Sequence, residues 1–159
     1  MIDFKNCKLE ELTKEELIEA LNSKKELDSY NILNKVYEIN KVNDKYYSYF
    51  DEFLNMVDGK TSFSRMRGVG LCSSLVKWDK DNKIDQNLDK FLSLFEDEKP
   101  TTVRITITCM IDILKVKPYL SGQIEKSLSR IDLTKYKESM SHLIEKDIKN
   151  IKEIITNLE

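Results

Sequence analysis

The stretches DGKTSFSR at 58–65 and DEKPTTVR at 97–104 share four positions at a separation of 39 residues. Both open with aspartate, continue with a lysine and a hydroxyl residue, and close with arginine. The flanking apolar residues keep the same register: Tyr49, Phe53, Met56, Leu71, Cys72 and Leu75 correspond to Leu88, Leu92, Phe95, Met110, Ile111 and Leu114. Each stretch therefore joins two apolar helices. A two-helix unit repeated at about 40 residues is typical of an α-solenoid.

Apolar residues recur at intervals of three and four along most of the chain, as in amphipathic helices. We predict eight helices, at about 9–22, 26–42, 46–57, 62–78, 84–95, 100–114, 118–131 and 134–157. Thr13 and Glu16 have the spacing of a capping box at the first helix. Residues 101–108 alternate like a strand. We still predict a helix there, because Val103 and Ile107 continue a helical period.

These elements predict an all-α fold, an α-α superhelix of about four antiparallel helix hairpins in a single domain over 1–159. Residues 45–116 hold the two matching repeats. Residues 9–42 and 118–157 match them less well, as expected of N-terminal and C-terminal capping hairpins with a polar outer face.

The shared Asp-x-Lys-x-(Ser/Thr)-x-x-Arg string resembles the HEAT repeat family, which has an Asp between its two helices and an Arg early in the second. This resemblance implies a structural ladder in which Asp58 and Asp97 pair with Arg65 and Arg104, or with equivalent residues of neighbouring repeats. The whole chain, including Lys77-Trp78-Asp79, is similar to a group of small bacterial HEAT-like proteins, some of which carry the label SufBD from iron–sulfur cluster assembly. The scattered Cys7, Cys72 and Cys109 do not support that chemistry, because a cluster needs several converging thiolates.

Composition excludes several classes of function. A net charge of −2 and a pI near 5.6 give no bulk attraction to nucleic acid or to an anionic membrane. The sequence has neither a signal peptide nor a stretch of ~20 apolar residues that could span a membrane. We expect a cytoplasmic monomer with free thiols and without a cofactor, metal or catalytic site.

Four features were weighed as chemical sites and given structural interpretations. The run 79–85 lacks the Gly and Glu of a calcium loop, so we interpret it as a solvated connection. Gly68 and Gly70 lie inside a predicted helix, which favours close packing over a nucleotide loop. Cys72 falls on an apolar helix face, and His142 has no partner at metal-ligand spacing.

Charge placement is the remaining clue to function. The second helices of the repeats are basic and the first helices acidic, and in a solenoid the second helices line the concave face. We therefore predict a non-enzymatic protein-interaction module that offers a basic concave groove, with Arg67, Lys77, Trp78 and Lys115, to an acidic protein segment. One alternative is that structural pairs use up Arg65 and Arg104 and that Trp78 is half-buried core. Another is nucleic-acid binding, as in HEAT-like DNA-repair proteins, which the overall acidity disfavours.

Overall fold

The computed structural model describes residues 8–23 and 26–158, without the side chains of 26–28. Every element in this part of the chain is an α-helix or a 3-10 helix, so the predicted all-α class is confirmed for it. The chain forms two compact units, one ending at Trp78 and the other beginning at Asp79. The single domain over 1–159 stays a prediction.

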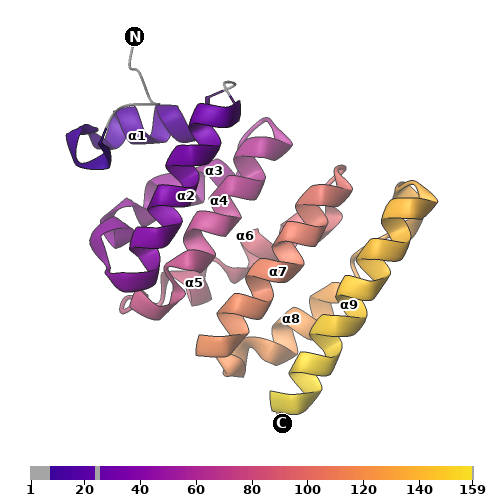
Figure 1. The fold of residues 1–159 in the computed structure, drawn as a ribbon. Coiled ribbons are helices and arrows are strands. Elements are labelled where there is room, and N and C mark those ends of the chain that lie inside the picture. The colour runs from indigo at the N-terminus through magenta and orange to yellow at the C-terminus, as the bar shows by residue number, and fades with distance from the viewer. Residues whose placement is uncertain (1–7, 24–25, 159) are drawn as a thin grey trace. The chain divides into compact units, whose positions relative to one another are not determined.

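The first unit contains two pairs of packed helices. Its elements are η1 (Leu9–Glu11), α1 (Lys14–Leu21), α2 (Glu26–Val42), η2 (Lys45–Tyr49), α3 (Phe50–Val57), α4 (Ser62–Ser74) and η3 (Val76–Trp78). Helix α1 packs against α2, α3 packs against α4, and α2 and α4 lie side by side (Figure 1). The predicted capping box is confirmed: Thr13 Oγ1 accepts from Glu16 N, and Thr13 N donates to Glu16 Oε1.

Two glycines allow α4 to approach its neighbours closely, as predicted. A Cβ on Gly68 would lie 2.6 Å from Val57 N, in the backbone of α3. A Cβ on Gly70 would lie 2.3 Å from the Tyr37 hydroxyl of α2. The close packing offsets the cost of glycine inside a helix, about 1 kcal/mol relative to alanine.

The second unit repeats this layout. Its elements are α5 (Lys83–Gln86), α6 (Leu88–Leu92), η4 (Ser93–Glu96), α7 (Pro100–Val116), η5 (Pro118–Leu120), α8 (Ser121–Leu128), η6 (Leu133–Lys135) and α9 (Glu138–Leu158). Segment η4 packs against α7, α8 packs against α9, and α7 and α9 lie side by side (Figure 1). Each unit thus places its two second helices next to each other.

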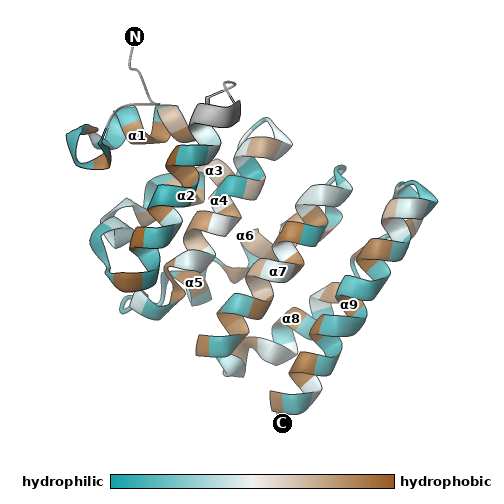
Figure 2. Ribbon diagram, viewed as in Figure 1, coloured by the Kyte–Doolittle hydropathy of each residue, from teal (hydrophilic) through white to brown (hydrophobic). Residues whose placement is uncertain are grey.

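The core agrees with the repeat register. Most of the apolar residues that match across 39 positions are buried in both units, for example Phe53 with Leu92 and Leu75 with Leu114, whereas Tyr49 and Ile111 are half-buried. Figure 2 shows hydrophobic and hydrophilic residues alternating along the helices, as amphipathic helices require.

Residues 101–108 are helical, as predicted, although their β-branched side chains favour a strand. The hydroxyl of Thr106 donates to Thr102 O at 2.7 Å, and that of Thr108 donates to Arg104 O at 3.3 Å. Threonine hydroxyls can thus be satisfied inside a helix by the carbonyl one turn earlier.

Six of the eight predicted helices are wrong in detail, because each is divided into shorter α or 3-10 segments; only 26–42 and 100–114 form single helices, α2 and α7. The clearest case is 84–95, which forms α5, α6 and η4. Asn87 separates α5 from α6 with φ −116° and ψ 12°, and its side-chain nitrogen donates to Lys83 O at 2.7 Å. This local hydrogen bond competes with the helical ladder and ends α5.

Candidate functional site

Arg67, predicted to face a partner, is buried, with 6% of its surface exposed. Its guanidinium donates to Leu21 O at 2.7 Å and to the hydroxyl of Ser29, and stacks 3.6 Å from the centre of the Phe63 ring. The prediction of an exposed Arg67 is therefore wrong. The guanidinium is instead hydrogen-bonded to α1 and α2 of the first unit. Sequence periodicity could not show this, because the acceptors lie far away along the chain.

The side chains of Lys77 and Trp78 donate hydrogen bonds to the C-terminal end of α2, so they are engaged within the first unit. Trp78 Nε1 donates to Asn40 O at 2.7 Å, and Lys77 Nζ donates to Lys41 O and lies 5.0 Å from the Trp78 ring centre. The last carbonyls of a helix have no partner within it, and a cation there favours the helix dipole. The half-buried Trp78 fits the structural alternative better than it fits a partner anchor.

The second unit uses a similar lysine–aromatic pair. Lys135 Nζ donates to Glu96 O at 2.8 Å, and the Tyr136 hydroxyl donates to Asp97 O at 2.5 Å. Lys135 lies 5.9 Å from the Tyr136 ring centre. Because each pair donates to two consecutive carbonyls of its own unit, we interpret both pairs as structural.

The predicted Asp–Arg ladder needs correction at Arg104. Its guanidinium binds Asp147 of α9, with Nε–Oδ2 at 2.6 Å and Nη2–Oδ1 at 3.3 Å, rather than Asp97. The hydrogen bond to Asp147 raises the pKa of Arg104. This two-point pair joins α7 to the next hairpin, and sequence reasoning missed it because the acid lies on a helix and not in the inter-helix turn.

The other ladder residues make local backbone contacts. Arg65 Nη1 donates to Gly59 O at 3.1 Å, across the turn between α3 and α4. Asp97 is buried, and its Oδ1 accepts from Lys99 N at 2.9 Å just before α7 begins. Asp58 is the C-terminal cap residue of α3. The pairing of Asp58 and Asp97 with arginines stays a prediction.

Lys115 is exposed on α7, as the interaction hypothesis requires, and pairs with Asp112 at 3.5 Å. The second unit also exposes Lys146, Lys149 and Lys152 on α9, where they line an open groove. None of these three lysines makes a hydrogen bond or an ion pair to another described residue, and their only acidic neighbours lining the groove are Glu145 and Glu153. Sequence reasoning overlooked them, although their spacing of three residues was visible.

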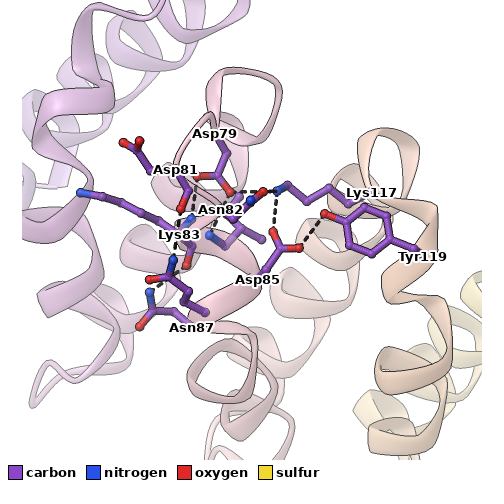
Figure 3. Close-up of polar contacts among 10 residues, drawn as sticks. Asp79, Asp81, Asn82, Lys83, Asp85, Asn87, Lys117 and Tyr119 are labelled. Atoms are coloured by element: carbon purple, nitrogen blue, oxygen red, sulfur yellow. Dashed lines mark hydrogen bonds and ion pairs between the residues drawn. The ribbon is translucent and has the colours of Figure 1, made fainter.

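The most organised polar cluster of the second unit surrounds Lys117 (Figure 3). It begins with Asp79, which caps α5 by accepting from Lys83 N at 2.8 Å and from Ile84 N at 2.9 Å. Asn82 between them has φ 55°, a left-handed conformation that asparagine tolerates. The expectation that this run is merely a solvated connection is wrong for Asp79, whose side chain is 0% exposed.

Lys117 brings an ammonium group into this turn. Its Nζ lies 3.1 Å from Asp79 Oδ2, 2.5 Å from Asp85 Oδ1 and 3.1 Å from Asn82 Oδ1. Burial alone would lower the pKa of Lys117, but hydrogen bonds to the two carboxylates outweigh it and raise this pKa to about 12.

Asp85 is held by a second donor, because the Tyr119 hydroxyl donates to its Oδ2 at 2.6 Å. Burial tends to raise the pKa of Asp85, yet the hydrogen bonds from Lys117 and Tyr119 prevail and lower it. A lysine fixed as a cation cannot act as a nucleophile or a base near neutral pH. The cluster is therefore a structural clasp between the start of α5 and the start of η5.

The remaining side chains that could carry out chemistry, cysteine thiols and possible metal ligands, are buried or far apart. Cys72 and Cys109 are buried thiols outside any disulfide, consistent with the predicted core packing of Cys72, whereas Cys7 lies outside the described residues. Within residues 8–23 and 26–158, no three His, Cys, Asp or Glu side chains gather where they could hold a metal ion.

Comparison with known family models, curated proteins and solved structures finds no match for this chain. Among the described helices, none has the length and apolar character needed to cross a membrane.

Proposed function

We propose that this chain is a non-enzymatic protein-interaction module built as a short HEAT-like α-solenoid. The observation that carries the proposal is the layout common to both units, in which two helix pairs place their second helices side by side. This layout agrees with the 39-residue repeat of the sequence. Stacked hairpins of this kind provide extended, pre-organised binding surfaces.

The partner segment we propose is acidic and binds the second helices of the second unit. Lys115 of α7 and Lys146, Lys149 and Lys152 of α9 are exposed there, and the three α9 lysines line a groove. They replace Arg67 of the original hypothesis, because Arg67 is buried. Three lysines against two glutamates in the groove favour a modest, salt-dependent attraction.

Nucleic-acid binding has less support. A phosphate-binding face needs a strongly basic surface, whereas the chain has a net charge of −2 and the three groove lysines are accompanied by Glu145 and Glu153. We therefore do not propose it.

A fluorescence anisotropy titration with a labelled hexaglutamate peptide tests the acidic partner. The triple variant Lys146→Gln, Lys149→Gln and Lys152→Gln should weaken binding by about tenfold or more at low salt, with little change in Tm, since exposed substitutions usually cost within about 0.5 kcal/mol. The matched control changes Lys80, Lys99 and Lys126 to Gln, which removes the same charge from exposed positions outside the groove. Equal weakening by both triple variants would show non-specific attraction and refute the groove.

A further inference from the structure

We infer that a small hollow between α1, α3 and α4 of the first unit binds the cationic side chain of a lysine or arginine from a partner protein. This site has the opposite charge preference to the groove on α9 and does not depend on it. The hollow has a volume of about 230 Å³ and is lined by Ile18, Asn22, Glu52, Asn55, Met56 and Ser64. It is smaller than the roughly 300–1,000 Å³ of pockets for drug-sized ligands, which suits one side chain.

The first support is a carboxylate oxygen without a donor. Glu52 Oε1 accepts from Lys14 Nζ at 3.1 Å, whereas Glu52 Oε2 is buried and has no hydrogen-bond partner. A buried charged acceptor without a donor is costly. The terminal torsion of glutamate is soft, so the carboxylate can turn this oxygen toward the hollow at little cost.

The second support is that two polar side chains lining the hollow already use donors in hydrogen bonds to backbone carbonyls of the first unit. Asn22 Nδ2 donates to Ile18 O at 3.0 Å, and Ser64 Oγ donates to Met56 O at 3.2 Å. The Asn22 amide oxygen and the lone pairs of Ser64 remain to accept. An ammonium or guanidinium group supplies several N–H donors and no acceptor, which is the complement that these groups need.

The third support is the charge and shape of the surroundings. Residues 8–21 contain five glutamates against two lysines, and Asp51 and Glu52 add acidity on α3. Ile18 and Met56 contribute apolar wall, along which the methylene stem of a lysine can pack while its head group reaches the carboxylate. A negative surface with a partly apolar hollow fits a basic segment and repels an acidic one.

The test is an NMR titration with Nα-acetyl-lysine methylamide, observing the methyl groups of Ile18 and Met56. Both signals should shift with the lysine probe. The norleucine probe, whose straight side chain ends in a methyl group and carries no ammonium, should shift them far less. Glu52→Gln should raise the Kd by about tenfold or more, which corresponds to ~1.4 kcal/mol. It should still fold, because Lys14 and Glu52 are each about one-third exposed, and such partly solvated pairs usually contribute only about 1 kcal/mol.

Two further variants separate the hollow from a general electrostatic effect. Glu11→Gln removes the same charge from an exposed position of η1 outside the hollow and should change the Kd by less than about twofold, because exposed charges are screened over ~8–10 Å. Ile18→Phe narrows the hollow without changing its charge and should abolish the shift of the remaining reporter, the Met56 methyl group. Equal weakening by Glu52→Gln and Glu11→Gln, or equal shifts with norleucine, would overturn the inference.

Self-association provides a last check. If the Ile18 and Met56 signals move with protein concentration alone, a second copy fills the hollow and the partner we propose is wrong. Hexaglutamate binding at α9 should be unchanged in Glu52→Gln, so this inference and the proposed function can fail separately.

Discussion

Among the side chains that the structure describes, each unit buries one basic residue, and the two lie in different surroundings. Arg67 of the first unit is 6% exposed and donates to a backbone carbonyl and a hydroxyl, with a phenylalanine ring against its guanidinium plane. Lys117 of the second unit is 5% exposed and lies between the carboxylates of Asp79 and Asp85.

The difference follows from the geometry of the two cations. A planar guanidinium spreads its charge over several donors and stacks on rings, so it suits carbonyls and an aromatic face. An ammonium is a compact charge that needs close anionic partners when buried. We therefore expect that loss of Lys117 lowers the free energy of unfolding more than loss of Arg67 does.

The largest effect should come from Lys117→Met. This change leaves the fully buried Asp79 carboxylate without its cation and should cost about 3–5 kcal/mol of unfolding free energy. Urea unfolding measures it, with Lys115→Met, two residues earlier and exposed, as a control near zero. A loss below about 1 kcal/mol for Lys117→Met would show that the clasp does not stabilise the fold.

Arg67→Met should cost about 1–3 kcal/mol, because it leaves Leu21 O and the Ser29 hydroxyl without this donor. The same urea experiment measures this loss. The unfolding free energy of Arg67→Lys should fall between those of the unsubstituted protein and Arg67→Met, because lysine keeps the charge but lacks the planar set of guanidinium donors. If Arg67→Met is more damaging than Lys117→Met, the proposed contrast between the units is reversed.

The two glycines of α4 should respond unequally to alanine. In Gly68→Ala the new Cβ meets the backbone of α3, which should cost about 1–3 kcal/mol of unfolding free energy. The higher helix propensity of alanine offsets ~1 kcal/mol of this cost. Gly70→Ala should be near neutral, since its Cβ meets only the movable end of Tyr37. Thermal unfolding would decide, and equal Tm values for the two variants would contradict the close approach of α3 and α4.

The smallest expected effect is a pH dependence from the clasp. The pKa of Asp85 is lowered in the folded state, so its contribution is complete above its unfolded value of 3.8 and is lost as pH falls through the folded value. The pKa of Lys117 is raised from 10.5 to about 12, so its contribution is lost as pH rises across that range. Asp85→Asn should flatten the acid side of a plot of unfolding free energy against pH. An unchanged slope would exclude Asp85 as its source.

The all-α class, the 39-residue repeat, most core positions and the capping box at Thr13 could be predicted without a structure. These features depend on local periodicity and on side chains a few residues apart, which the order of residues shows directly. Gly68 and Gly70 also indicated close packing, because glycine inside a helix is costly without it.

The cations that are available to a partner could not be predicted in this way, because their exposure depends on tertiary packing. Arg67 and Lys115 occupy similar positions in the charge pattern, yet Arg67 binds Leu21 O, 46 residues earlier, and Lys115 is exposed. The partner of Arg104, Asp147, lies 43 residues later on another helix. Exposure and pairing depend on which distant helix packs against a residue. Helical periodicity assigns a residue to a face but does not identify what covers that face.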